Sequence, residues 1–195
     1  GACYDLHDIE AIKNVTTANR LSLHLDGARI FNALVYKNQD PKAFGTLFDS
    51  ISICLSKGLG APVGSVLIGS AAFIKKARRW RKVFGGGMRQ AGSLAAAGIY
   101  ALENHIDRLA QDHQHALILK EALAKKDFVD SILEVETNIV IANIKGKYTA
   151  TSLSEALKEK GILTIAMSPT QIRFVTHLDI SETQMAQTIE LIKQL

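Results

Sequence analysis

The chain has 195 residues, of which 47% are hydrophobic and 22% charged, and 23 basic against 19 acidic residues give a net charge of +4. This hydrophobic content excludes wholesale disorder, and so small a net charge does not by itself indicate nucleic acid or a membrane as a partner. No apolar run approaches the roughly 18 residues that a spanning helix needs. Two cysteines and no signal-peptide pattern argue against a secreted disulfide framework. We therefore expect a cytoplasmic protein.

The first part of the chain alternates helix and strand patterns. Asp5 is placed to cap the first helix, and alternating leucines at 21–25 indicate the first strand. The expected elements, in order, are a helix from 5 to about 20, a strand at 21–25, a helix at 28–37, strands at 48–54 and 63–68, a basic helix at 71–82 and an alanine-rich helix at 91–103. Such alternation predicts an α/β unit with a mostly parallel sheet.

The last ninety residues have a different order of elements. We expect helices at 106–126, 149–160 and 181–194, and strands at 131–135, 138–144, 162–166 and 171–176. Thr151 or Ser152 is placed to cap the middle helix, and Ser181 the last one. This order predicts a smaller α+β unit with largely antiparallel pairing. We expect the two domains to be 1–104 and 105–195, joined by a continuous helix.

Two residues at expected strand ends, Asp26 and Lys57, could carry chemistry. The carboxyl ends of parallel strands lie side by side, and ligands bind in the crevice outside them. Ser56, Gly58 and Gly60 leave room for a bulky group near the Lys57 amine. A lysine that binds the aldehyde, opposite an aspartate that keeps the ring nitrogen protonated, is what a pyridoxal phosphate site needs. A structural aspartate cap and a surface lysine in a turn remain the alternative.

Four ordered segments carry a more specific pattern, namely HLDGARIFNA at 24–33, SICLSKGLGAPVGS at 52–65, GGGMRQAG at 85–92 and QIRFVTHLD at 171–179. Together they resemble low-specificity L-threonine aldolases, a subgroup of the fold-type-I pyridoxal phosphate enzymes. The resemblance is close to colinear over almost the whole chain. It implies a partial fold-type-I large domain in 1–104, followed by a small α+β C-terminal domain in 105–195.

The resemblance also implies a role for individual residues. Lys57 resembles the lysine that binds the cofactor aldehyde, and Asp26 resembles the partner of the pyridine nitrogen. Arg29 and Arg173 resemble the arginines that bind the substrate carboxylate, a task that suits a planar guanidinium. Two further cations, Arg89 and Lys82, resemble groups that reach the cofactor phosphate across a subunit interface. A homodimer or homotetramer is therefore expected.

The implied reaction is the cleavage of L-threonine, and of related β-hydroxy amino acids, to glycine and acetaldehyde. The residues do not identify the base that takes the hydroxyl proton, although His24 is a weak candidate. The resemblance places Gly1 in the middle of the large domain, so that the phosphate cradle and the ring that stacks on the cofactor would lie upstream. We therefore expect this chain alone to bind the cofactor poorly and to turn over slowly.

Several other interpretations compete with this one. A non-catalytic remnant that serves as an oligomerisation or interaction module, or another fold-type-I activity such as transamination, would share the Asp26 and Lys57 pair. The basic segment 75–82 could bind nucleic acid, but the small net charge favours a solvated helix face or the phosphate role. His113 and His115 are two residues apart and face different ways on a helix, so no metal site is expected.

Overall fold

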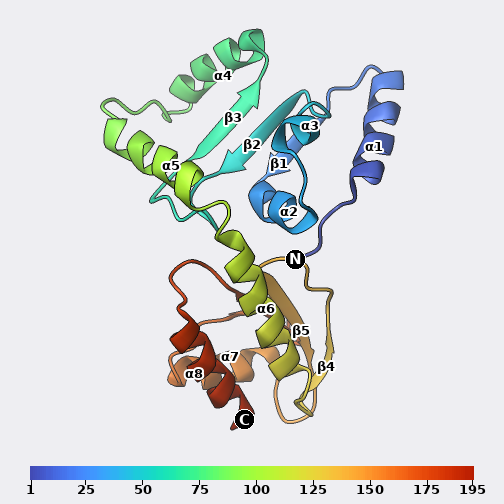
Figure 1. The fold of residues 1–195 in the computed structure, drawn as a ribbon, viewed down its shortest axis with the longest axis vertical. Coiled ribbons are helices and arrows are strands. Elements are labelled where there is room, and N and C mark those ends of the chain that lie inside the picture. Colours follow the sequence, from blue (N-terminus) through green and yellow to red (C-terminus); the bar gives the residue numbers. More distant parts are fainter. The chain divides into compact units, whose positions relative to one another are not determined.

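The structure is a computed structural model that describes residues 1–195. The chain forms two compact units (Figure 1). The N-terminal unit is Tyr4–Asp107, and the C-terminal unit is Arg108–Leu195 together with Gly1–Cys3. The expected domain division between residues 104 and 105 stays a prediction, and each unit is described by itself.

The N-terminal unit contains a three-stranded sheet in the order β1-β2-β3. Its elements are α1 (Leu6–Ala18), β1 (His24–Gly27), α2 (Ile30–Lys37), α3 (Pro41–Gly45), β2 (Ser50–Cys54), β3 (Ser65–Gly69), α4 (Ala71–Val83) and α5 (Gly92–Asn104). β1 and β2 are parallel, whereas β3 runs antiparallel to β2. The expectation of a mostly parallel sheet holds for β1, which contains Asp26, and for β2, which precedes Lys57.

One face of this sheet is covered by an apolar cluster built on Ile9, Leu34 and Phe44, from α1, α2 and α3. Leu25 of β1 packs against this cluster. Because side chains alternate along a strand, His24 and Asp26 lie on the opposite face of β1. The alternation of apolar and polar residues along β1 therefore directs Leu25 into the core and the polar side chains to the other face of the sheet.

Asp49 fixes the start of both parallel strands. Its carboxylate Oδ2 accepts from the backbone N of Leu23 at 2.7 Å and from Lys13 Nζ at 3.1 Å, while its own backbone N donates to Leu23 O at 2.9 Å. The Leu23 amide, and then the Lys13 ammonium, hold the pKa of the Asp49 carboxyl below its ordinary value. These contacts tie the residue before β2 to the residue before β1 and so fix the register of the pair.

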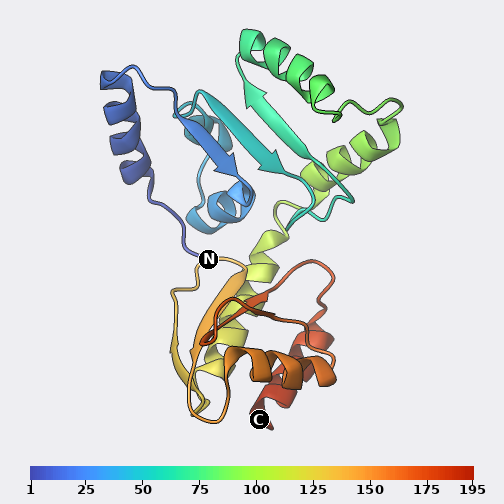
Figure 2. The same cartoon turned by 180° about the vertical axis from the view of Figure 1, so that it is seen from behind.

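The C-terminal unit contains a four-stranded antiparallel sheet in the order β4-β5-β7-β6. Its elements are α6 (Leu109–Leu123), β4 (Val129–Ile132), β5 (Ile139–Ile144), α7 (Ala150–Glu159), β6 (Ile165–Ala166), β7 (Gln171–Val175) and α8 (Glu182–Lys193). The predicted antiparallel α+β unit is therefore confirmed. Seen from behind, the strands lie in front of α6 (Figure 2).

The core of the C-terminal unit is larger than that of the N-terminal unit. Alternate residues of β5 and β7 point into it, and leucines of α6 and α7 meet them; the fully buried members include Val140, Ala142, Ile172, Leu153 and Leu123. The residues between them along β5 and β7, among them Ile141 and Arg173, point to the other face of the sheet and are half-buried. Arg173 is thereby held on the face away from the core.

Three local expectations were wrong. α5 ends at Asn104 and α6 begins at Leu109, so no continuous helix joins the two parts. Thr149, and neither Thr151 nor Ser152, caps α7, with Ser152 completing a capping box. Asp5 occupies the N-cap position of α1 without a capping hydrogen bond, because its carboxylate binds Lys37 Nζ at 2.8 Å instead.

The short helix α3 was not predicted. Asp40 caps it by accepting from the backbone N of Lys42 at 3.1 Å and of Ala43 at 3.2 Å, and Pro41 occupies its first turn. None of the helices combines the length and the apolar character that crossing a membrane requires.

Candidate active site

The register of the parallel pair determines where Asp26 and Lys57 lie. Asp26 is opposite Ser52, and β2 ends at Cys54, three residues before Lys57. Since parallel strands end at the same edge of a sheet, the carboxylate and the amine lie at the ends of neighbouring strands. Both residues are exposed. The N-terminal unit therefore presents an anion and a cation at one sheet edge.

The Asp26 carboxylate is only partly used within the unit. Its Oδ1 accepts from the backbone N of Ala28 at 3.1 Å, which turns the chain after β1 and fixes the side chain. The other oxygen forms no hydrogen bond. On the same face of β1, His24 Nδ1 lies 2.8 Å from Ser50 Oγ of β2. These polar groups leave one carboxylate oxygen and the second imidazole nitrogen available to a ligand.

Lys57 stands in a tight turn whose backbone is buried around it. Gly60 N donates to Lys57 O at 2.9 Å, and Ala61 N donates to Leu55 O at 2.9 Å. Gly60 has a φ of +69°, which favours glycine. Gly58 and Leu59 are buried, whereas the Lys57 side chain is exposed and forms no hydrogen bond or ion pair. The turn thus fixes the backbone at Lys57 and leaves the amine without a hydrogen-bond or ion-pair partner.

The two arginines expected at a substrate carboxylate lie in different units. Arg29 is the N-cap residue of α2, three residues after Asp26, and is half-buried. Arg173 lies in the middle of β7, where its backbone is paired with Ile141 of β5 and Ile165 of β6. The Nε of Arg173 is buried without a hydrogen-bond partner. A buried guanidinium donor without an acceptor is costly, so this atom is suited to an anionic ligand.

Lys82 and Arg89 belong to the segment between α4 and α5. Lys82 lies in the last turn of α4, and both side chains are exposed. Gly86 N donates to Arg81 O at 2.8 Å, so the glycine run folds back on the end of α4. In both views this segment lies at the opposite side of the N-terminal unit from β1 (Figures 1 and 2). The unit does not bring these two cations together with Asp26.

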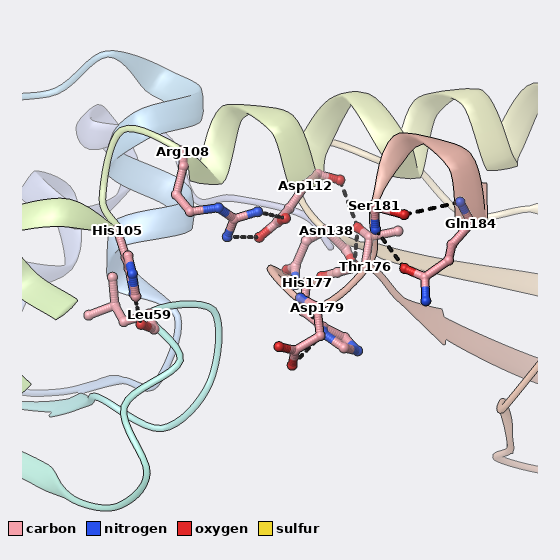
Figure 3. A network of polar contacts seen from close by, with 10 residues as sticks. All are labelled: Leu59, His105, Arg108, Asp112, Asn138, Thr176, His177, Asp179, Ser181 and Gln184. Atoms are coloured by element: carbon pink, nitrogen blue, oxygen red, sulfur yellow. Dashed lines mark hydrogen bonds and ion pairs between the residues drawn. The ribbon is translucent and has the colours of Figure 1, made fainter. Parts of the chain in front are cut away.

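Sequence reasoning missed one residue near the Lys57 turn. His105, the residue that follows α5, places its Nδ1 2.6 Å from Leu59 O (Figure 3). The two residues are 46 positions apart, and no periodic pattern connects them. A histidine at the end of a helix carries no local signal that could have predicted this contact.

The residues present fit pyridoxal phosphate, judged by their donor set. In the N-terminal unit, the exposed Lys57 amine can condense with its aldehyde, and the Asp26 oxygen without a hydrogen bond can face its ring nitrogen. In the C-terminal unit, taken by itself, the unsatisfied Nε of Arg173 can receive a carboxylate. No phosphate cradle follows Lys57, since the glycines there form a closed turn. The donor set of the N-terminal unit therefore fits the reactive end of the cofactor.

Comparisons with known proteins agree with this chemistry. Residues 1–147 match the model of the beta-eliminating lyase family. The low specificity L-threonine aldolase of Escherichia coli (strain K12) is 47% identical over 172 residues, which cover 88% of this chain and 50% of that protein. The low-specificity L-threonine aldolase 1 of Arabidopsis thaliana is 38% identical over 197 residues, covering 100% of this chain and 55% of that protein. The chain thus spans about half the length of the curated relatives it matches.

Solved structures confirm the expected fold class. A putative aromatic amino acid beta-eliminating lyase/threonine aldolase from Exiguobacterium sp. 255-15 aligns with a TM-score of 0.82 at 25% identity, covering 100% of this chain and 58% of that one. The ornithine aminotransferase from Toxoplasma gondii ME49 aligns with a TM-score of 0.68 at 15% identity, covering 97% of this chain and 46% of that one. The chain has part of the fold-type-I architecture.

Proposed function

Because the chain belongs to the beta-eliminating lyase family, we propose that it is the part of a threonine aldolase that carries the reactive lysine. The reaction is the cleavage of L-threonine, and of related β-hydroxy amino acids, to glycine and acetaldehyde. The observation that carries the proposal is the pair Asp26 and Lys57 at the ends of two neighbouring parallel strands. Four matching segments and the relatives named above support the aldolase reaction over other lyase reactions.

Lys57 and Asp26 have complementary tasks in this proposal. The Lys57 amine would hold pyridoxal phosphate through its aldehyde. The Asp26 carboxylate stabilises a proton on the ring nitrogen, because an anion lowers the free energy of a nearby cation. When bound, the cofactor supplies an electron sink for the bond that breaks.

Arg29 and Arg173 bind the carboxylate of the amino acid. The unsatisfied Nε of Arg173 supports this role, since a carboxylate would provide the missing acceptor. Two guanidinium groups fix the orientation of the amino acid so that its Cα–Cβ bond is the one that breaks. The hydroxyl proton leaves as the aldehyde forms, and the Cα carbon regains a proton before glycine is released.

Lys82 and Arg89 act on the cofactor phosphate of a second subunit. Their exposure and their position away from β1 support a task outside their own unit. A phosphate bound across a subunit interface needs a second subunit, so we propose a homodimer or homotetramer, and we propose the cytoplasm as its location. Removal of both cations, in Lys82→Ala with Arg89→Ala, should weaken cofactor binding in the assembled protein.

Acetaldehyde release from L-threonine tests the function directly. The assay uses the full chain with pyridoxal phosphate, alone and together with a fragment that supplies the upstream half of a relative. We expect little turnover by the chain alone, restored turnover with the fragment, and loss to background in Lys57→Ala. Lys125→Ala, another exposed lysine, is the control and should retain activity. Amino-group transfer to a keto acid without acetaldehyde would instead assign an aminotransferase activity.

A further inference from the structure

The end of α5 contacts the Lys57 turn at two places. A Cβ built on Gly98 would lie only 3.1 Å from Leu55 Cδ1, so the helix approaches the residue that follows β2 closely. About two turns later, His105 Nδ1 lies 2.6 Å from Leu59 O. Leu55 and Leu59 flank Lys57 by two residues on either side. The helix therefore supports the backbone of the turn both before and after the lysine.

The contact determines which nitrogen of His105 carries hydrogen. A backbone carbonyl only accepts hydrogen bonds, so Nδ1 must donate at this distance. The ring is also held from one side, because Tyr100 packs edge-on against it with a centroid separation of 5.4 Å. His105 is thus an oriented donor, and Figure 3 shows its ring directed at Leu59.

The Leu59 carbonyl lies inside the turn that holds Lys57. Gly60 N, the next amide, donates to Lys57 O at 2.9 Å, so the peptide that His105 holds also closes the turn on the lysine. Leu59 is 3% exposed, and its carbonyl would otherwise lack a partner in a largely buried place. Loss of the His105 donor would free this peptide to rotate and would loosen the turn.

We propose that His105 is a positioning residue for Lys57, which rests on the proposed role of Lys57 as the aldehyde-binding lysine. It does not touch substrate or cofactor. Its Nδ1–H fixes the Leu59–Gly60 peptide, and this peptide fixes the direction in which the Lys57 amine leaves the end of β2. This hydrogen bond therefore raises the rate at which the Lys57 amine reacts with an aldehyde, relative to the other lysines of the chain.

The test measures covalent capture of Lys57 in the full chain. The protein is incubated with pyridoxal phosphate and reduced with borohydride, and peptide mass spectrometry gives the labelling rate of Lys57 relative to Lys125. Condensation of the amine with the aldehyde releases water, and hydride reduces the resulting C=N bond to a stable amine. His105→Phe keeps an aromatic ring without the donor. His105→Asn keeps a side-chain donor. His105→Asp has the same shape as the asparagine variant, but an ionised carboxylate can only accept and so cannot bind the Leu59 carbonyl.

We expect His105→Phe and His105→Asp to lower the Lys57 to Lys125 ratio about two- to tenfold, the usual effect of one lost hydrogen bond, and His105→Asn to restore most of it. If His105→Phe does not fold, the Asn and Asp pair decides the question. Equal ratios in Asn and Asp variants, or no change in Phe, would overturn the inference. The labelling is measured with the upstream fragment present, as in the activity assay. Failure of the unsubstituted chain to label Lys57 above Lys125 under these conditions would overturn the role of Lys57 itself, and the positioning role with it.

Discussion

At the scale of single residues, the Asp26 carboxylate uses its two oxygens for different tasks. One oxygen accepts from Ala28 N and turns the chain after β1, and the other forms no hydrogen bond. Shape and charge can therefore be separated by substitution. An asparagine preserves an acceptor for the amide of Ala28 but removes the negative charge that the proposed reaction needs.

Asp26→Asn should weaken the binding of pyridoxal phosphate about ten- to hundredfold, the effect of losing a hydrogen bond to a charged group. The free energy of unfolding should change by less than about 0.5 kcal/mol, because the site is exposed. Absorbance titration and urea unfolding measure the two effects. Asp8→Asn, an exposed carboxylate of α1, is the control. Unchanged cofactor affinity would contradict the role of Asp26.

At the scale of elements, α6 combines an ion pair and two buried histidines in its first two turns. Arg108 donates to both oxygens of Asp112, at 2.5 and 3.2 Å (Figure 3). Asp112 is 0% exposed, and the Arg108 side chain is 22% exposed. The backbone O of Asp112 accepts from Thr176 Oγ1 at 2.7 Å, which connects α6 to the end of β7.

Asp112→Asn should lower the free energy of unfolding by about 3 kcal/mol, because it leaves a partly buried guanidinium without its counter-charge. Glu190→Gln provides the matched control. Glu190 pairs with Lys193 at 2.6 Å, but both side chains are more than half exposed, so its loss should cost at most about 0.5 kcal/mol. Urea unfolding of both variants gives the comparison. Equal costs would show that burial does not strengthen the Asp112 contact.

His113 should make the stability of the protein depend on pH. Burial lowers the pKa of His113, and the neighbouring Asp112 opposes this shift. Below pH ~6.5 the unfolded chain takes up a proton at this residue while the folded chain resists it, so stability falls as pH falls. We expect His113→Leu to flatten the loss of unfolding free energy between about pH 6.5 and pH 5.5. An unchanged slope in urea unfolding series would contradict this assignment.

The sequence predicted elements whose signals are local and missed those that depend on distant contacts. Ser181 was expected to cap the last helix, and its Oγ accepts from Gln184 N at 3.2 Å. The strand expected at 21–25 is observed at His24–Gly27, because the pairing with β2, and not the alternation of leucines, decides the bounds. The contact of His105 with Leu59 depends on how α5 packs, which no local pattern encodes.

At the scale of the whole molecule, each of the two units has an apolar core of its own. One joins α1, α2 and α3 in the N-terminal unit, and the larger one joins α6, α7 and α8 to the antiparallel sheet. All side chains of each of these cores belong to a single unit. Damage to one core should therefore act first on its own unit.

Leu153→Ala should destabilise the C-terminal unit by about 2–5 kcal/mol, because Leu153 is 0% exposed and leaves a cavity. Native-state hydrogen exchange should become faster in β5 and β7 while the amides of β1 and β2 keep their rates. Leu117→Ala, at a leucine of α6 that is 37% exposed, is the control and should have a much smaller effect. Equal acceleration in β1 and β2 would indicate a single cooperative core.

The position of Gly1–Cys3 has a consequence for folding during synthesis. Gly1 N donates to Ile139 O at 2.7 Å, Glu136 N donates to Gly1 O at 3.2 Å, and Cys3 N donates to the Glu136 carboxylate. These partners are made more than 130 residues later. At about 5–20 residues per second, the ribosome adds them roughly 7 to 28 seconds after residues 1–3. The C-terminal unit can thus acquire residues 1–3 only after Glu136 and Ile139 have been synthesised, through contacts between positions that are more than 130 residues apart.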